Sequence, residues 1–235
     1  MGSIFRAMGM TMAIPDYSTL SRRGETVVVN LPKEEKNNVM VIEDSTGLKV
    51  YGEGEWKVRQ HGWSKHRTWR KFHVMITPDG EIRAIELTNN ATTDAEVAPR
   101  LLDQEQPSII TGFVGDGGYD RRVVYDACQN RNIKTVTVPP QKNAKIFIHG
   151  NRKTTPHPRD ENLRQIRKTS RTHWKEQSGY HIRSLVENTM FRLKTIFGDR
   201  LNARLFPQQR TEAAIKASLL NRMWQLGMPE SYLAA

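Results

Sequence analysis

Hydrophobic and polar residues alternate along two neighbouring stretches of the chain, residues 69–77 and 81–88. Alternation with a period of two predicts strands that bury one face, and the Pro78-Asp79-Gly80 sequence between them predicts a tight turn. A continuous apolar run at residues 39–44, which ends in Asp44, predicts a buried strand. The pattern therefore predicts three antiparallel strands.

Predicted helices and strands alternate after this hairpin. In chain order they are a helix over residues 93–104 capped by Thr92 or Thr93, a strand over 109–116 that ends at Asp116, a helix over 121–130 capped by Asp120, and a strand over 134–138. This order predicts an α/β fold whose sheet starts antiparallel and becomes parallel.

A later helical stretch carries four reactive side chains on a single face. At about 100° per residue, Tyr180, Arg183 and Lys194 all lie within roughly 40° of Glu187. The opposite face is expected to pack on the core, and it consists of Ile182, Leu185, Thr189, Leu193 and Ile196. An ordinary ion pair between Arg183 and Glu187 on a solvated face is the alternative, although Arg before Glu is the less favourable order for such a pair.

The last predicted helix begins at Thr211 and is closed by Gly227. Ile215, Leu219, Met223 and Leu226 recur on one of its faces. We expect that face to pack on the core, and we expect no chemistry in this helix.

Composition narrows the class of partner. With 36 Lys and Arg against 25 Asp and Glu, the 235 residues carry a formal charge of +11, which favours a polyanionic partner, nucleic acid first. No apolar run approaches the ~18 residues of a spanning helix, and the N-terminus lacks the apolar core of a signal peptide. We therefore expect a cytoplasmic protein with no membrane partner. The single cysteine, Cys128, excludes an internal disulfide.

Two segments are rich in positive charge. Residues 56–71 contain six cations, three tryptophans and no acidic residue, and residues 141–175, here called the basic insertion, contain ten cations and two acidic residues. Cations beside aromatic rings suit phosphate contact and base stacking, whereas solvated loops are the alternative for both segments. We expect DNA contacts from Lys65, Arg67, Arg70 and Lys71 in the first segment and from Arg164, Arg167 and Lys168 in the second.

Three carboxylates stand out as candidate catalytic groups. Asp44 and Asp116 each end a predicted strand, and Glu187 lies on a helix that follows them. If the three meet at one end of the sheet, their oxygens suit Mg²⁺ or Mn²⁺. Two such ions roughly 3.5–4 Å apart can activate an attacking hydroxyl and stabilise a leaving oxygen in phosphoryl transfer. Each acid alone is weak support, because an Asp at a strand end is often only a turn former.

The motifs around these acids resemble those of a known family. Asp44-Ser45-Thr46-Gly47, the sequence from Asp116 to Asp120, and the spacing Tyr-x2-Arg-x3-Glu-x6-Lys from Tyr180 to Lys194 are similar to the three motifs of DDE transposases from bacterial insertion sequences, in the insertion-sequence-five-like branch. The resemblance implies a ribonuclease-H-like mixed sheet with flanking helices and a basic insertion before the last catalytic helix.

The same resemblance implies an activity and its partners. Asp44, Asp116 and Glu187 would hold Mg²⁺ or Mn²⁺, two ions per site, for DNA cleavage at transposon ends and strand transfer into target DNA. Arg183 and Lys194 would contact DNA phosphates near the site, and Tyr180 would either contact the DNA or order the start of the helix. A homodimer or higher multimer on double-stranded DNA, associated with the bacterial nucleoid, is expected.

The N-terminal part is expected to be a separate region. Residues 1–35 are interpreted as the remnant of a helical DNA-binding region and linker, so that the chain looks truncated at its start, and residues 36–230 as the catalytic domain. We expect residues 1–12 to be poorly ordered, followed by a short helix that Asp16 caps and that ends before Gly24. This helix is either the second helix of a helix-turn-helix or a plain linker helix.

Three other functions are alternatives to the transposase. A nuclease of the same fold would cut DNA without joining it, and a DNA-binding remnant would do neither. A glycosidase that uses two of the carboxylates explains none of the basic residues and is remote.

Overall fold

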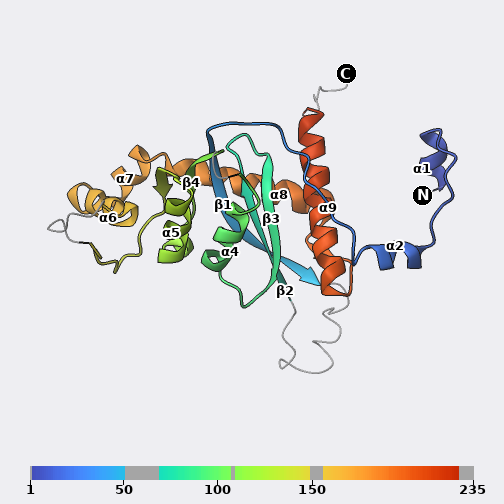
Figure 1. Cartoon of the computed structure of the whole chain (residues 1–235), viewed down its shortest axis with the longest axis horizontal. Helices are drawn as coiled ribbons and strands as arrows, with labels where there is room; N and C mark the ends of the chain where they lie inside the picture. The colour runs from blue at the N-terminus through green and yellow to red at the C-terminus, as the bar shows by residue number, and fades with distance from the viewer. Residues whose placement is uncertain (1, 51–68, 107–108, 149–155, 228–235) are drawn as a thin grey trace, which may run out of the picture.

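A mixed β-sheet forms the centre of the molecule (Figure 1). The computed structural model describes residues 2–50, 69–106, 109–148 and 156–227. The strands are β1 (Val39–Val50), β2 (Trp69–Ile76), β3 (Ile82–Asn89), β4 (Ile110–Val114), β5 (Thr135–Thr137) and β6 (Arg200–Leu201). The path through the sheet is β3-β2-β1-β4-β5, antiparallel from β3 to β1 and parallel from β1 to β5. The predicted ribonuclease-H-like mixed sheet is confirmed.

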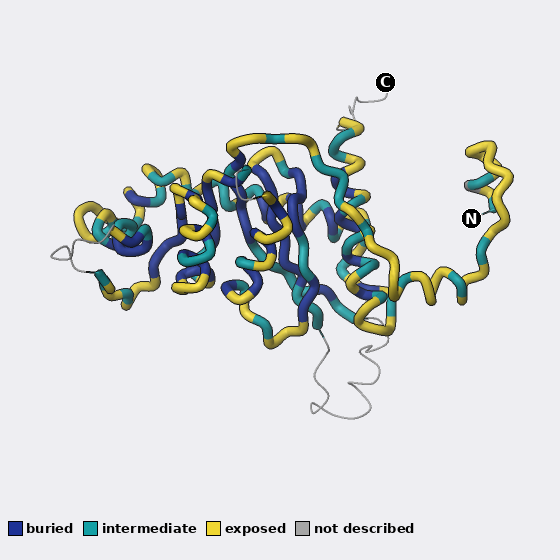
Figure 2. The backbone as a smooth tube through the Cα atoms, viewed as in Figure 1, coloured by how far each residue is buried: buried dark blue, intermediate teal, exposed yellow. Residues whose placement is uncertain are grey.

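Helices cover both faces of this sheet. Because successive strand residues point to opposite faces, Val41 packs with α4 (Asp94–Leu102) and α5 (Arg122–Asn130), whereas Ile42 packs with α8 (Ser184–Phe197) and α9 (Phe206–Gln225). The remaining helices are α1 (Gly2–Ala7), α2 (Tyr17–Arg23), α6 (Pro158–Lys168) and α7 (Arg171–Gln177), with 3-10 turns η1 (Gly117–Tyr119) and η2 (Tyr180–Arg183). The burial map in Figure 2 shows the buried chain concentrated in the strands and in the inner sides of these helices.

The predicted end of the first strand at Asp44 is wrong. Asp44 lies in the middle of β1, opposite Val74 of β2, and β1 continues to Val50. The strand continues because it keeps partners on both edges: its last residues pair with β2 on one side and with β6 on the other. Only the parallel neighbour β4 stops early, at Val114, opposite Ile42.

The packing face predicted for α9 is also wrong. Ile215, Leu219, Met223 and Leu226 are exposed, and α9 instead buries small or hydrogen-bonding residues, among them Ala213, Ala217 and Asn221. Asn221 explains why this face of α9 is the buried one. Its side chain accepts a hydrogen bond from the Ile82 amide (2.8 Å) and donates to the Ile82 carbonyl (2.7 Å). A polar face of α9 therefore packs against the edge strand β3, because the backbone groups of β3 need hydrogen-bond partners.

The helix that carries Glu187 differs from the prediction in detail. It starts as the η2 turn and continues as α8, which buries Val186, Thr189, Met190 and Leu193. Ile196, which we expected to be packed, is exposed.

The basic insertion is more ordered than its sequence pattern indicates. Residues 158–177 form α6 and α7, where no regular structure was predicted. His157 and Ser170 cap the two helices by accepting hydrogen bonds from the amides of Arg159 (3.3 Å) and His173 (3.1 Å). These caps are local, but the apolar residues that fix the helices, Leu163 and Trp174, are too few to give a periodic pattern.

The N-terminal segment extends away from the sheet (Figures 1 and 2). The predicted cap is confirmed, because Asp16 accepts a hydrogen bond from the Ser18 amide at 2.7 Å and α2 ends before Gly24. Gly2–Ala7 forms α1, a helix that the sequence pattern does not predict. No residue of α2 is buried. The division of the chain near residue 35 stays a prediction.

Across the described ranges, no helix combines the length and the apolar character needed to cross a membrane.

Candidate active site

Asp44 and Asp116 lie side by side where β4 leaves β1. Ile42 and Val114 are paired in parallel register, and each aspartate follows two residues later, Asp116 with an extended backbone (φ −77°, ψ −177°). Two residues along a strand return to the same face, and here that is the face covered by α8. The early end of β4 therefore leaves two carboxylates together at an open edge.

The charge of Asp116 acts on Asp44. Burial raises the pKa of Asp44, hydrogen bonds from the Ser45 amide and from Arg183 oppose that rise, and Asp116 adds to it. The Asp116 carboxylate is itself held in place by the Gly118 amide, which donates to Oδ1 at 2.7 Å.

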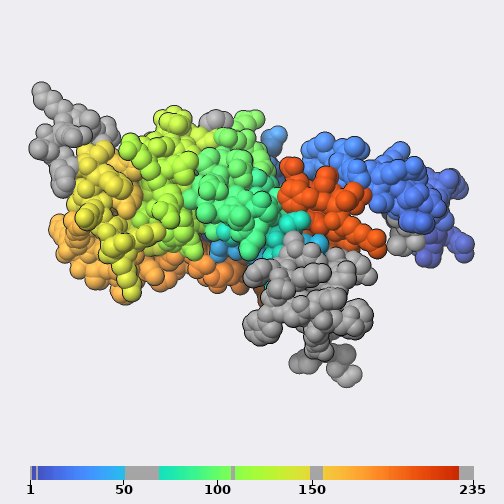
Figure 3. All heavy atoms as spheres, turned by 90° about the horizontal axis from the view of Figure 1, so that it is seen from below, coloured from blue at the N-terminus to red at the C-terminus, as the bar shows by residue number. Residues whose placement is uncertain are grey.

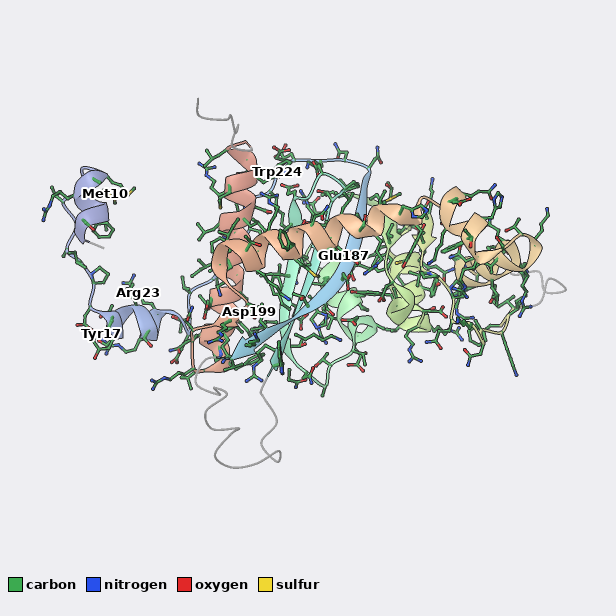
Figure 4. All side chains as sticks on the ribbon, turned by 180° about the vertical axis from the view of Figure 1, so that it is seen from behind. Met10, Tyr17, Arg23, Glu187, Asp199 and Trp224 are labelled. Carbon is green, nitrogen blue, oxygen red and sulfur yellow. The ribbon has the colours of Figure 1, made fainter. Side chains whose placement is uncertain are left out.

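Glu187 reaches these aspartates through Arg183. Figure 4 shows α8, on which Glu187 is labelled, crossing this face of the sheet. The Arg183 guanidinium nitrogen Nη2 lies 2.9 Å from Asp44 Oδ2 and 2.8 Å from Glu187 Oε1. The side chain of Glu187 is 56% exposed, so this carboxylate lies at the mouth of the site. The i,i+4 pair that was our alternative for Arg183 and Glu187 is present, and it is shared with Asp44.

Lys194 and Tyr180 complete the surroundings of the acids. Lys194 Nζ donates to Thr46 Oγ1 on β1 at 2.6 Å. The Tyr180 ring packs on Trp174 of α7, with 6.1 Å between ring centroids, and Lys175 Nζ lies 5.1 Å from the Tyr180 centroid. Of the four side chains predicted to share one face, Arg183 and Lys194 contact β1, Glu187 is paired with Arg183, and Tyr180 packs against α7.

The donor chemistry suits a hard divalent cation, but the acids are not assembled around a common point. Three carboxylates offer only oxygen, the ligand type that Mg²⁺ and Mn²⁺ prefer. Within the described residues, however, no three Asp, Glu, His or Cys side chains are grouped closely enough to hold a metal ion. The Arg183 guanidinium supplies the positive charge between Asp44 and Glu187 instead.

The other predicted DNA contacts fall in different places. Lys65 and Arg67 lie outside the described residues. Arg70 Nε donates to Gln209 Oε1 of α9 at 2.8 Å, and Lys71 Nζ contacts Asp94 of α4 at 3.0 Å, on the opposite face from Asp44. The structure does not bring these two cations to the carboxylate site.

Within the basic insertion the three predicted contacts differ from one another. Arg164 is paired with Glu161 and donates from Nη2 to the Ile148 carbonyl at 2.6 Å. Arg167 makes a longer bond, 3.3 Å, to the Ala144 carbonyl, and Arg167 and Lys168 are both exposed. Arg164 therefore supports the loop before α6, whereas Arg167 and Lys168 face solvent.

Sequence reasoning missed a buried polar cluster under the opposite face. Glu43 is fully buried, with no hydrogen-bond partner for either carboxylate oxygen, and burial together with Asp94 raises its pKa well above the usual range. His73 is also fully buried, and its Nδ1 lies 3.2 Å from Asp94 Oδ1. Glu43 stands within the apolar run of residues 39–44. A Glu at an inward position of a buried strand has to be neutral or paired, so this position in the sequence already indicates a buried polar group.

The expected helix cap at Asp120 is wrong. Arg121 occupies the cap position of α5 without a side-chain bond, and Asp120 accepts hydrogen bonds from Arg159 in the basic insertion instead. The reason is burial, because a carboxylate with 1% exposure needs a charged partner that a helix end does not supply.

Comparison with known proteins identifies the family of this chain. A family model described as "Transposase DDE domain" matches residues 36–222, and a second model with the same description matches residues 1–53. No solved structure matches the chain. The match over residues 36–222 includes all three acids and the motifs around them, and the chain therefore belongs to the DDE transposase family.

Proposed function

We propose that this chain is a transposase that cleaves DNA at the ends of an insertion sequence and joins the freed ends to target DNA. The observation that carries the proposal is the neighbouring pair Asp44 and Asp116 at the edge where β4 ends, with Arg183 linking Asp44 to Glu187 and Lys194 bound nearby on β1. Its membership of the DDE transposase family supports phosphoryl transfer on DNA as the chemistry.

In this proposal the three carboxylates hold one or two Mg²⁺ or Mn²⁺ ions. When bound, such ions activate an attacking water or 3′-hydroxyl and stabilise the leaving oxygen. Asp44 and Asp116 provide the rigid half of the site, because both are fixed by strand register and by backbone amides. Glu187, exposed on α8, provides the adjustable half.

The cations of the site would then hold the DNA. Arg183 contacts Asp44 and Glu187 in this structure and would turn to a phosphate when a metal neutralises those acids. Lys194, now bound to Thr46, lies about two helical turns beyond Glu187 on α8 and would contact a phosphate nearby. Both roles use charge-assisted hydrogen bonds, the stronger kind for phosphate recognition.

The direct test separates cutting from joining. The protein is incubated with Mg²⁺ and a labelled duplex that carries candidate insertion-sequence ends, and nicked and joined products are resolved in the same reaction. Asp116→Asn is expected to form neither product, whereas Glu176→Gln, an exposed acid on α7 that touches none of the three carboxylates, is expected to form both. Nicks without joined product would favour a nuclease.

One observation favours a second function, DNA binding without catalysis. The acids are not grouped for a metal and Arg183 occupies the space between two of them. A protein that binds the duplex but forms no product with either Mg²⁺ or Mn²⁺ would be such a DNA-binding remnant.

A further inference from the structure

A buried ion pair joins the turn after Asp116 to the basic insertion. Arg159 of α6 donates from Nε to Asp120 Oδ1 at 2.7 Å and from Nη2 to Asp120 Oδ2 at 3.3 Å. The two side chains are only 8% and 1% exposed. Neither group can therefore contact DNA or a metal in this arrangement.

Both members of the ion pair make further hydrogen bonds to the basic insertion. Asp120 Oδ2 also accepts a hydrogen bond from the Gln141 amide at 2.9 Å, where the basic insertion begins. Arg159 donates from Nη1 to the Lys145 carbonyl at 3.0 Å, and its guanidinium carbon lies 4.6 Å from the centroid of the Phe147 ring. One buried arginine thus holds both the start of the insertion and the carboxylate of Asp120.

Asp120 lies in the same tight turn as Asp116. The Tyr119 amide donates to the Asp116 carbonyl at 3.1 Å, and the Asp120 amide donates to the Gly117 carbonyl at 3.3 Å. Gly117 and Gly118 have no side chains with which to fix this turn. Its position is set by the buried ring of Tyr119 on one side and by the ion pair of Asp120 on the other.

The insertion is tied to the rest of the site at its other end as well. Arg171 donates from Nη2 to the Pro140 carbonyl at 2.6 Å, and Trp174 packs on Tyr180, where the segment that carries Glu187 begins. In Figure 3 the yellow and orange atoms of the insertion lie directly against the yellow-green atoms that follow β4. The basic insertion therefore connects the turn that follows Asp116 to the helical segment that carries Glu187.

We propose that Arg159 is a positioning residue, which through Asp120 holds the Asp116 turn in register with the DNA-binding insertion. The inference rests on the proposed function for its catalytic consequence, but not for its structural one. When the buried cation that pairs with a carboxylate is removed, the carboxylate moves, because an unpaired charge is unstable away from water. Small displacements of a catalytic group cost rate while the binding of a distant part of the substrate is unchanged.

The variants are chosen so that charge, shape and folding can be separated. Arg159→Met keeps the length of the side chain and removes the ion pair. Arg159→Lys keeps the charge but cannot make the two hydrogen bonds that the guanidinium makes to Asp120. Asp120→Asn keeps the shape of the partner side chain. The matched control is Arg131→Met, which removes another arginine–aspartate pair, with Asp103, remote from the carboxylate site. If Arg159→Met does not fold, Arg159→Lys and Asp120→Asn carry the test.

Two readouts decide the outcome, and only one needs an active enzyme. Amide hydrogen exchange of residues 115–121 is expected to be faster in Arg159→Met and Asp120→Asn than in wild type, and unchanged in Arg131→Met. In single-turnover cleavage at saturating DNA, the rate is expected to fall about ten- to hundredfold for Arg159→Met, with partial recovery in Arg159→Lys and DNA affinity within about twofold of wild type.

Either readout can overturn the proposal. Unchanged exchange in the 115–121 turn means that Arg159 does not position it. A loss of DNA affinity as large as the loss of rate means that Arg159 acts through binding. If the wild type forms no product at all, the proposed function fails, and the exchange experiment still decides whether Arg159 holds the turn.

Discussion

Arg183 and Asp44 are joined by a contact of 2.9 Å between Nη2 and Oδ2, across the boundary between the η2 turn and the sheet. The same nitrogen contacts Glu187 at 2.8 Å. A single guanidinium therefore bridges two of the three acids that we propose to be catalytic. A divalent cation bound by Asp44 and Glu187 has to compete with this arginine.

Replacing Arg183 with Met is expected to strengthen the binding of divalent metal and weaken catalysis. Removing the cation frees both carboxylates for the metal, and it also removes a phosphate contact. Mn²⁺ affinity is measured by electron paramagnetic resonance in the absence of DNA, and the cleavage rate separately. A roughly tenfold gain in Mn²⁺ affinity corresponds to ~1.4 kcal/mol, well within the range of a charge-assisted contact. Weaker Mn²⁺ binding in this variant would show that Arg183 supports the metal site rather than competing for it.

Asp44→Asn, Asp116→Asn and Glu187→Gln are each expected to abolish cleavage and to leave DNA affinity equal or higher. Each change removes a metal ligand and a negative charge that repels phosphate. Gel-shift titration in EDTA measures binding without metal, and product formation in Mg²⁺ measures catalysis. Robust cleavage by any one variant would remove that residue from the proposed site. Full activity of the wild type in a chelator would exclude the divalent metal.

Cations of the basic insertion are expected to differ in what they do. The double variant Arg167→Gln with Lys168→Gln should weaken binding to all DNA sequences and reduce the slope of log affinity against log salt by about one unit per lost phosphate contact. Arg164→Gln should instead lower the midpoint of thermal unfolding, because this arginine supports the Ile148 carbonyl and pairs with Glu161. Unchanged affinity across a salt series for the double variant would show that this part of the insertion is only a solvated surface.

Glu43→Gln is expected to stabilise the protein increasingly as pH rises. Burial raises the pKa of Glu43 well above its usual range, so the folded state keeps a proton that the unfolded chain releases above a pH of about 4.3. The unfolding free energy of the wild type therefore falls as pH rises from there towards the folded pKa, by at most ~1.4 kcal/mol per pH unit for one proton. The variant lacks this slope.

The measurement for Glu43 is urea unfolding of wild type and variant between pH 4 and 8. The exposed Glu176→Gln serves as the control, since the same chemical change at the surface leaves the slope as it is in wild type. A difference between wild type and Glu43→Gln that is independent of pH would show that Glu43 is ionised in the folded protein.

Deletion of residues 2–24 is expected to lower DNA affinity and to leave the unfolding midpoint nearly unchanged. No residue of α2 is buried, and its last turn carries Arg22 and Arg23. Competition between end-containing and scrambled duplexes, with and without this deletion, measures whether the segment contributes sequence preference. Equal affinity before and after deletion would remove residues 2–24 from the proposed DNA-binding region.

Local pattern was sufficient for the hairpin and for the family motifs. The alternation at residues 69–77 and 81–88 predicted β2 and β3, although buried residues lie on both faces of each strand. The spacing from Tyr180 to Lys194 predicted that these side chains share one side of a helical segment, since helical geometry depends only on neighbours in sequence. The three motifs were sufficient for the family.

Only the tertiary structure decided where the chain's polar groups find partners. β1 runs past Asp44 because β2 and β6 flank it, and α9 turns Asn221 inward because the edge of β3 has unpaired backbone groups. Neither neighbour is visible from the sequence of the element itself. The same holds for Asp120, whose partner Arg159 lies 39 residues away. A buried charge is satisfied by whichever opposite charge the fold brings to it, and that pairing is settled by packing rather than by pattern.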